Sequence, residues 1–248
     1  HSDNDLVLKT DGNIINETTA DDTMKSTGQY SSNNSLAAPA VISSGADLTL
    51  DAKENIKLTG GGVLAEGDVN IKAGKSVIGN ATVENYSTKE YTGHYNRGNN
   101  GLWSIAFSPY MEVDRHRWDR IETGALIGAG KNVRIESGED INLKGTTIQA
   151  NENILTYSKG STTMTPGYSS FSASQTGYDL GHIEGIFKNP RNKYDRAFIR
   201  QWYKNSSHYG TDVVSPELFA GGKIQIFSEN NITLEAAKVS SLDGIDVV

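Results

Sequence analysis

Two short clusters contain residues of the types that perform chemistry. Asp114, Arg115 and His116 are consecutive and could serve acid–base catalysis, and His182 with Glu184 could form half of a metal site. Neither cluster has the spacing of a known motif, and neither accompanies a Gly-rich phosphate loop or a nucleophile elbow. We interpret both as solvated loop residues, and we predict no catalytic residues, no metal and no cofactor.

Carboxylates suggest a second kind of chemistry, because a polysaccharide lyase or hydrolase needs acidic residues clustered on one groove-forming face. The acidic residues here fall at predicted turns and are spread along the repeats described below: Asp51, Glu54, Glu66, Asp68, Glu136, Glu139 and Asp140. We therefore predict that the protein is not an enzyme. A polysaccharide-active β-helix enzyme stays as the least favoured alternative.

Composition excludes several classes of protein. The chain has 248 residues, a net charge of −7 and no cysteine, which argues against a nucleic-acid-binding role and excludes disulfides and thiolate metal sites. No apolar run is long enough to cross a membrane as a helix, and the start lacks a signal-peptide pattern. Both ends fall inside a repeating pattern, so we expect a fragment of a longer protein, monomeric in isolation.

An internal repeat organises the chain. Residues 45–65 and 221–241 align without a gap on residues 130–150. Apolar residues two positions apart recur at the same places in each copy, which is typical of short strands with one apolar face. The equivalent residues are Leu48 and Leu50, Val133 and Ile135, Ile224 and Ile226, and then Ile56 and Leu58, Ile141 and Leu143, Ile232 and Leu234.

A shorter period of about 21 residues lies inside each copy, since Leu48 and Leu50 recur as Val69 and Ile71. Three short strands per period predict an all-β fold. We expect a right-handed parallel β-helix of triangular section, with about 21 residues per coil and one strand on each side.

Polar residues share one turn position in the three copies: Asn55, Asp140 and Asn231. Asn and Asp tolerate turn conformations, and stacking of the coils predicts that these side chains form a ladder. We treat residues 1–248 as a single β-helix fragment.

The unit at residues 130–154 has a distinctive set of positions: Val133 and Ile135 after Gly130, the strand at residues 140–143, Gly145, and a close at residues 148–150. It resembles the haemagglutinin repeats of large two-partner-secreted exoproteins, which include filamentous haemagglutinin and the exoproteins of contact-dependent growth inhibition. The resemblance covers about half of the chain.

The resemblance implies a protein that is secreted or held at the outer-membrane surface of a Gram-negative bacterium, with an outer-membrane transport pore as its partner during export. It further implies a structural role in virulence, as the rigid β-helical stalk of an adhesin or of a protein that delivers a C-terminal toxin.

Two excursions interrupt the repeat, and the resemblance does not extend to them. The first, residues 85–124, is predicted to be a β-hairpin with strands at residues 86–95 and 111–121. The second, residues 157–214, is predicted to be a loop followed by a short amphipathic helix at about residues 190–204. A shorter polar stretch, residues 17–36, is expected to be a loop.

The excursions hold most of the aromatic residues and a basic cluster, so they carry the candidate partner-binding residues: Trp103, Tyr110, Trp118, Tyr194, Arg196, Arg200, Trp202 and Tyr203. Aromatic and basic side chains suit a cell-surface protein, a glycan or a lipid on a target cell. The alternative function is therefore a specific receptor- or glycan-binding module. The same residues could instead pack the excursions onto the rod, and the sequence leaves both interpretations open.

Overall fold

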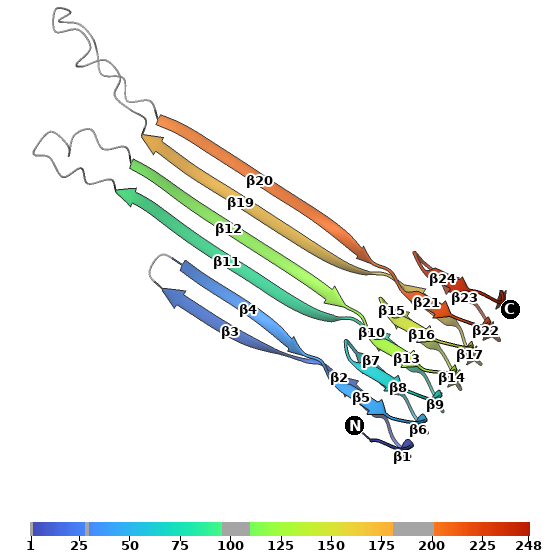
Figure 1. The fold of residues 1–248 in the computed structure, drawn as a ribbon. Coiled ribbons are helices and arrows are strands. Elements are labelled where there is room, and N and C mark those ends of the chain that lie inside the picture. The colour runs from blue at the N-terminus through green and yellow to red at the C-terminus, as the bar shows by residue number, and fades with distance from the viewer. Residues whose placement is uncertain (1, 28–29, 96–109, 181–200) are drawn as a thin grey trace, which may run out of the picture.

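The computed structural model describes residues 2–27, 30–95, 110–180 and 201–248, and every regular element in these segments is a β-strand. None of the described segments is a helix long and apolar enough to cross a membrane. The molecule has two parts: a rod of stacked coils, and a flat arm that projects from one corner of the rod (Figure 1).

The first rod sheet contains seven parallel strands, each contributed by a successive coil. They are β1 (Leu6–Thr10), β6 (Leu48–Ala52), β9 (Val69–Ala73), β14 (Val133–Ser137), β17 (Ile154–Ser158), β22 (Ile224–Ser228) and β25 (Ile245–Val247).

The second and third rod sheets contain six parallel strands each. The second has β2 (Ile14–Glu17), β7 (Ile56–Thr59), β10 (Val77–Asn80), β15 (Ile141–Lys144), β18 (Thr162–Thr165) and β23 (Ile232–Leu234). The third has β5 (Val41–Ser44), β8 (Gly62–Ala65), β13 (Leu126–Ala129), β16 (Thr147–Ala150), β21 (Glu217–Ala220) and β24 (Lys238–Ser241).

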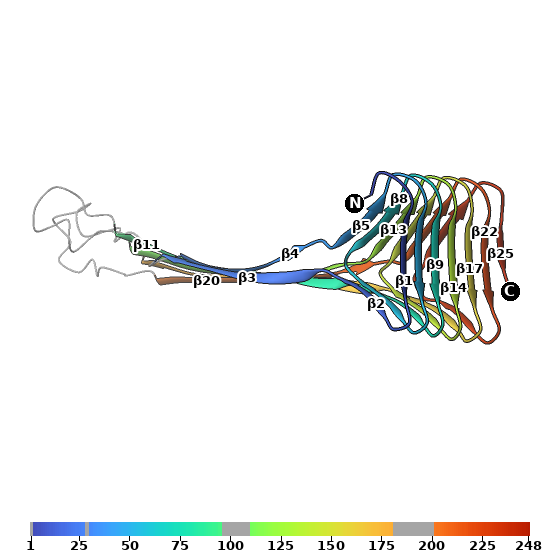
Figure 2. The same cartoon turned by 90° about the horizontal axis from the view of Figure 1, so that it is seen from below.

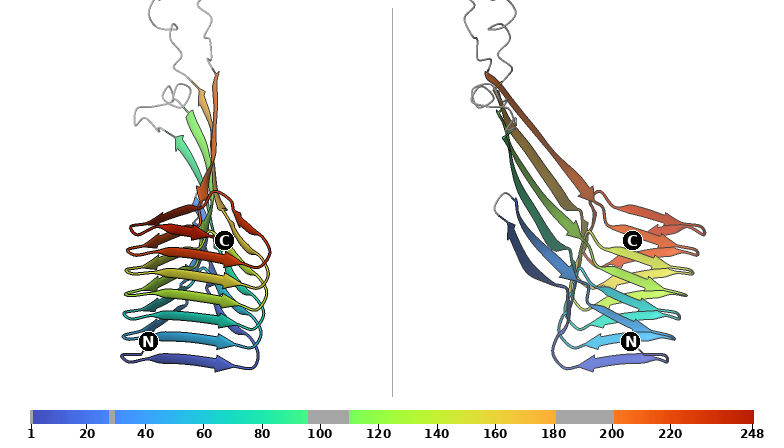
Figure 3. Two further views of the ribbon diagram at one scale, coloured as in Figure 1. Left: turned by 90° about the vertical axis from the view of Figure 1, so that its right-hand side faces the viewer. Right: turned by 60° about the vertical axis from the view of Figure 1, so that its left-hand side comes forward.

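One strand from each sheet makes one coil, and the coils stack from the N-terminal to the C-terminal end (Figure 3). The register confirms the repeat seen in the sequence, because Leu48 pairs with Val69, Val69 with Val133, and Ile154 with Ile224. The fold of the rod is therefore a parallel β-helix, as predicted.

The rod is held together by apolar columns that run along its axis. Inward side chains of all three sheets are buried, and equivalent positions hold similar residues: Leu50, Ile71, Ile135 and Ile226 in the first sheet, Ile56, Val77 and Ile141 in the second, Val63, Ile127, Ile148 and Leu218 in the third. Burial of each such side chain contributes about 1.5–3 kcal/mol. No single coil could bury its own apolar face, so each coil depends on its neighbours.

Polar ladders run along two corners of the rod. At the corner before the second sheet, Asn55 donates its backbone N–H to Asn13 Oδ1 (2.9 Å) and accepts from Ser76 N (3.1 Å). Ser161 N donates to Asp140 Oδ1 at 2.7 Å in the same ladder. The predicted stacking of Asn55 and Asp140 at one corner is thus present, with serines in the intervening coils.

The corner before the first sheet carries a longer ladder, which the sequence pattern does not reveal. Each side-chain Oδ1 accepts the backbone N–H of the next coil: Asp5 from Asp47 (3.2 Å), Asp47 from Asp68 (2.8 Å), Asp68 from Asn132 (3.0 Å), Asn132 from Asn153 (3.1 Å) and Asn153 from Lys223 (2.8 Å). Asn and Asp suit these turns because their short side chains can reach a neighbouring backbone donor.

The arm is one six-stranded antiparallel sheet, in the order β20-β19-β12-β11-β4-β3. It consists of three hairpins: β3 (Thr19–Thr27) with β4 (Tyr30–Ala38), β11 (Thr82–Tyr95) with β12 (Tyr110–Thr123), and β19 (Gly167–Leu180) with β20 (Gln201–Val214). Figure 2 shows the arm as a single layer that extends away from the coils.

All three hairpins leave the rod at the corner between the second and third sheets, and they do so in every second coil. Two strands of a hairpin occupy about 2 × 4.8 Å across a sheet, and two coils rise by the same distance. This equality of spacings lets separate hairpins join into one continuous sheet.

The coils without a hairpin turn the same corner in two or three residues, with a left-handed backbone. Gly60 and Gly145 have φ angles of 57° and 58°, and the corresponding residue of the next such coil, Ala236, has 49°. Glycine adopts this conformation without strain, whereas alanine pays a steric penalty.

Three sequence-based expectations are wrong. Residues 17–36 are not a loop, because β3 and β4 form a hairpin there. The second excursion does not start at residue 157, because β17 and β18 first form two sides of a coil and the chain leaves at Gly167. The predicted helix does not reach residue 204, because β20 begins at Gln201; residues 190–200 lie outside the described segments.

The first excursion matches its prediction. The hairpin expected at residues 85–124 is the hairpin of β11 and β12, which pair from Thr82 with Thr123 to Tyr95 with Tyr110. Its strands are longer than predicted, because backbone pairing extends them beyond the alternating side-chain pattern.

Candidate partner-binding surface

The base of the arm is fixed to the rod by a buried carboxylate. The side chain of Glu122, in β12, is only 2% exposed. Its oxygens accept from Arg120 Nη2 (2.5 Å), from the backbone N–H of Tyr168 (3.0 Å) and from Lys144 Nζ of rod strand β15 (3.2 Å). The Glu122 N–H donates to Ser169 Oγ at 3.0 Å. One residue thus connects β12, β19 and the rod.

The electrostatics of this junction favour an ionised Glu122. Burial by itself raises the pKa of the carboxyl group, but hydrogen bonds from Tyr168 N, Lys144 and Arg120 outweigh burial, so the pKa is lowered. Gly167 makes the arrangement possible, because a Cβ at that position would lie 2.5 Å from Glu122 Oε2.

The two faces of the arm differ in chemistry, and the strand register assigns residues to each, because directly paired residues of antiparallel strands share a face. Trp118 pairs with Ser87 and Ser172, and Ser172 pairs with Tyr209. We call this side the Trp118 face. Its described side chains are Val83, Asn85, Ser87 and Lys89; His116, Trp118, Arg120 and Glu122; Tyr168, Ser170, Ser172 and Ser174; and Ser207, Tyr209, Thr211 and Val213.

Large aromatic residues are partly or largely exposed on the Trp118 face. Trp118 is 43% exposed, Tyr168 45% and Tyr209 82%. Serines flank Trp118 on both neighbouring strands, so no bulky side chain of a directly paired residue covers the ring. Exposed aromatic side chains of this kind are favoured at recognition surfaces.

The opposite face of the arm carries charges of both signs and its own aromatic contacts. Arg117 Nε donates to Asp119 Oδ2 at 2.8 Å, and the rings of Phe171 and His208 lie 5.5 Å apart. Burial, followed by a hydrogen bond to Glu84, raises the pKa of Tyr86. Many side chains on this face therefore engage one another.

The structure places four of the predicted binding residues on the arm. Trp118 is exposed in the middle of β12. Tyr110 begins β12, and Trp202 and Tyr203 lie at the start of β20. Because β19 pairs with both β12 and β20, the backbones of Tyr110, Trp202 and Tyr203 lie in three consecutive rows of directly paired residues at the far end of the arm. Trp103, Tyr194, Arg196 and Arg200 lie outside the described segments.

Sequence reasoning misses Tyr168 and Tyr209, which share the face of Trp118, and it misses Glu122. The segment from Gly167 to Leu180 is rich in Ser and Gly and gives a weak strand signal. Its assignment depends on pairing with strands on both sides, which no local pattern reveals.

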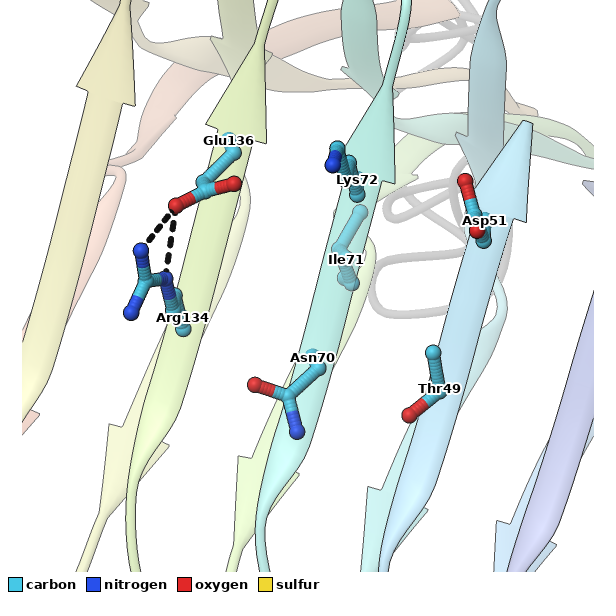
Figure 4. A pocket seen from close by; sticks show the side chains of 7 residues that line it. All are labelled: Thr49, Asp51, Asn70, Ile71, Lys72, Arg134 and Glu136. Carbon is cyan, nitrogen blue, oxygen red and sulfur yellow. Dashed lines mark hydrogen bonds and ion pairs between the residues drawn. The ribbon is translucent and has the colours of Figure 1, made fainter. Parts of the chain in front are cut away.

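The rod carries a shallow hollow of about 240 Å³ on the outward side of the first sheet (Figure 4). Lys72 lies there between Asp51 and Glu136 on the neighbouring strands. Asp51 is paired with Lys9 at 3.0 Å, and Glu136 accepts from Arg134 Nε at 2.7 Å. Asp51 and Glu136 are thus each paired with a cation of their own.

The histidine clusters considered in the sequence do not form a metal site in the described part of the chain, where no group of three or more His, Asp or Glu residues is placed to hold an ion. His116 lies on the Trp118 face and pairs with Lys89, while His208 packs on Phe171. His182 and Glu184 lie outside the described segments.

Comparisons with known proteins agree with the coil pattern. The family model described as hemagglutinin repeat matches residues 20–102 and 118–247, which covers most of the rod and of the arm strands. Searches of curated proteins and of solved structures found no match. Because the family model accounts for well over half of the sequence, the chain belongs to the hemagglutinin-repeat family.

Proposed function

We propose that this chain is a stalk segment of a large secreted surface exoprotein, and that its arm is the part that contacts a partner. The observation that carries the proposal is the combination of a repetitive rod with a lateral sheet. The rod consists of stacked coils with a continuous apolar interior, which suits a stiff spacer. The arm presents exposed aromatic residues on one face.

The finer features of the proposal rest on the family. Export would use a two-partner route through an outer-membrane pore of a Gram-negative cell, and the stalk would serve adhesion or the delivery of a C-terminal toxin, as in contact-dependent growth inhibition. Folding outside the cell suits the repetitive rod, because each coil can add to the previous one. The proposal includes no catalytic activity.

The test uses a rod from which the arm has been removed. The hairpin-free coils show how to build it, since β7 passes to β8 through Gly60 and Gly61 alone. Residues 18–40, 81–125 and 166–216 would each be replaced by Gly-Gly. Circular dichroism and a thermal melt would establish that the variant keeps its β-structure.

Binding of the labelled intact chain and of the armless rod to Gram-negative cells would then be compared by flow cytometry. We expect the intact chain to bind and the folded armless rod to lose binding. Equal binding by both proteins would assign the contact to the rod and contradict the role of the arm. No binding by the intact chain would contradict the adhesive role.

A further inference from the structure

We propose that the Trp118 face of the arm binds an acidic polysaccharide, with sugar rings stacked on its aromatic side chains and sugar carboxylates near its cations. This inference rests on the proposed function and names the partner class of the same arm. Three features carry it: the exposed rings, the hydroxyl and amide groups between them, and the sign of the charge.

The rings are arranged as separate platforms. Trp118 in β12 and Tyr209 in β20 lie in one row across the sheet, with Ser172 of β19 between them. Two strand spacings separate them by about 10 Å. A ring with its faces uncovered can stack on the C–H face of a pyranose. The row therefore offers two platforms to one extended chain rather than a single apolar patch.

Small polar side chains fill the space around these platforms. Ser87, Ser170, Ser172, Ser174, Ser207, Thr211 and Asn85 occupy most of the remaining described positions of the face. Hydroxyl and amide groups both donate and accept hydrogen bonds, which suits sugar hydroxyls. The same rows disfavour a membrane, because insertion would take these groups away from water without partners. They also leave no continuous apolar centre of the kind that a protein interface uses.

The described side chains of the Trp118 face carry a net positive charge, although the whole chain carries −7. Among the described side chains of this face, Lys89 and Arg120 are cationic and Glu122 is the carboxylate. Glu122 is buried and is bound by both Arg120 and Lys144. The exposed Lys89 pairs with His116 across β11 and β12, two rows from Trp118. An anionic ligand is therefore complementary to this described part of the face.

Three polymers separate ring stacking from charge. Polygalacturonate supplies pyranose rings and carboxylates, dextran supplies rings without charge, and polyphosphate supplies charge without rings. We expect the intact chain to bind polygalacturonate at least about tenfold more tightly than either of the other two. Equal affinity for polyphosphate and polygalacturonate would reduce the effect to charge alone and overturn the proposal.

Variants on the two faces localise the binding. Trp118→Ser and Tyr209→Ser should each weaken polygalacturonate binding by about tenfold, and Trp118→Tyr should retain most of it. Ile121→Ser, an exposed apolar residue on the opposite face, is the matched control. Lys89→Glu should weaken binding, whereas Lys72→Glu on the rod makes the same charge change without that effect. Unchanged thermal melts would show that the variants are folded.

Other outcomes would overturn the proposal. If the chain bound vesicles of phosphatidylglycerol but not polygalacturonate, the face would be a membrane surface. If Trp118→Ser abolished binding to cells while the intact chain showed no affinity for polygalacturonate, the partner would be of another class, and the adhesive role of the arm would stand. Equal binding by the Trp118-face variants and by Ile121→Ser would place the polysaccharide elsewhere.

Discussion

Glu122 of the arm and Lys144 of the rod form an ion pair of 3.2 Å, in which the carboxylate side chain is almost entirely buried. The pair joins β12 to β15, two strands that belong to successive coils. Arg120 and the backbone N–H of Tyr168 complete the surroundings of the carboxylate. One ionised side chain thus links the base of the arm to the rod.

Removal of the Glu122 charge should destabilise the protein at neutral pH. Because the pKa of Glu122 is lowered in the folded protein, its contribution is full above the ordinary value of 4.5 and is lost as the pH falls through the folded pKa. Glu122→Gln should reduce the free energy of unfolding by about 1–3 kcal/mol at pH 7, since Lys144 and Arg120 lose their partner. Urea unfolding at pH 7 and pH 3 measures it.

Below pH 4.5 the difference between wild type and Glu122→Gln should shrink. The control Glu139→Gln, at an exposed turn, should change the free energy of unfolding by less than about 0.5 kcal/mol. A difference of the same size at both pH values would show that the ionised carboxylate is not what matters at the junction.

Ala236 offers a stabilising substitution. It has a φ angle of 49° at the corner where Gly60 and Gly145 have nearly the same value. Ala236→Gly should increase the free energy of unfolding by about 0.5–1 kcal/mol, because relief of the left-handed strain exceeds the added chain entropy of glycine. Gly145→Ala should have the opposite effect. Thermal melts of the two variants measure both, and a lower melting temperature for Ala236→Gly would contradict the strain.

Thr156 tests the apolar column of the first sheet. Its side chain is fully buried between Ile135 and Ile226, and its hydroxyl has no hydrogen-bond partner. Thr156→Val should therefore stabilise the protein by about 1–2 kcal/mol. Thr162→Val is the matched control: Thr162 is equally buried, but its hydroxyl bonds Ser158 Oγ at 2.9 Å, so that change should destabilise. Chemical denaturation should therefore show Thr156→Val as more stable and Thr162→Val as less stable than the unchanged protein. The reverse ranking would refute the role assigned to the two hydroxyl groups.

The ladder at the corner before the first sheet makes a separate contribution. Asn132 accepts the N–H of Asn153 and donates Nδ2 to Asp68 at 3.0 Å. Asn132→Ala should lower the free energy of unfolding by about 1–2 kcal/mol, because the backbone N–H of Asn153 and the carboxylate of Asp68 each lose a hydrogen-bond partner. Asn142→Ala, which changes an outward residue of β15, should have little effect in the same urea titration. Equal effects would show that the ladder adds nothing to stability.

The rod can be predicted from the sequence because each coil repeats the same apolar positions. Leu48, Val133 and Ile224 occupy equivalent inward positions, and a gapless alignment of the chain with itself is enough to reveal them. The hairpin of β11 and β12 is also accessible, since its strands alternate and a Gly-Asn turn signal separates them.

The arm as a whole cannot be predicted in this way. Trp118 and Ser172 are neighbours only because two hairpins from different coils meet at the strand spacing, and neither residue belongs to a repeat. The helical spacing of aromatic residues near residue 204 is misleading, because from Gln201 onward the chain forms strand β20, whose backbone pairs with β19. The face that carries Tyr168, Trp118 and Tyr209 follows from that pairing.

The union of separate hairpins into one sheet is the central claim, because the projecting arm and its two unlike faces both depend on it. The chain has no cysteine, so an introduced pair reports on a single contact. Arg117 and Ala173 are directly paired between β12 and β19, at a Cα separation that a disulfide can span.

Arg117→Cys with Ala173→Cys should form an intramolecular disulfide quantitatively on mild oxidation. Arg117→Cys with Ser172→Cys should not, because a shift of one residue places the second thiol on the other face. Mass spectrometry of proteolytic fragments measures the linkage. The predicted result is that the first disulfide forms and the second does not. Equal cross-linking in both variants, or none in either, would contradict the pairing of β12 with β19 that joins the hairpins into one sheet.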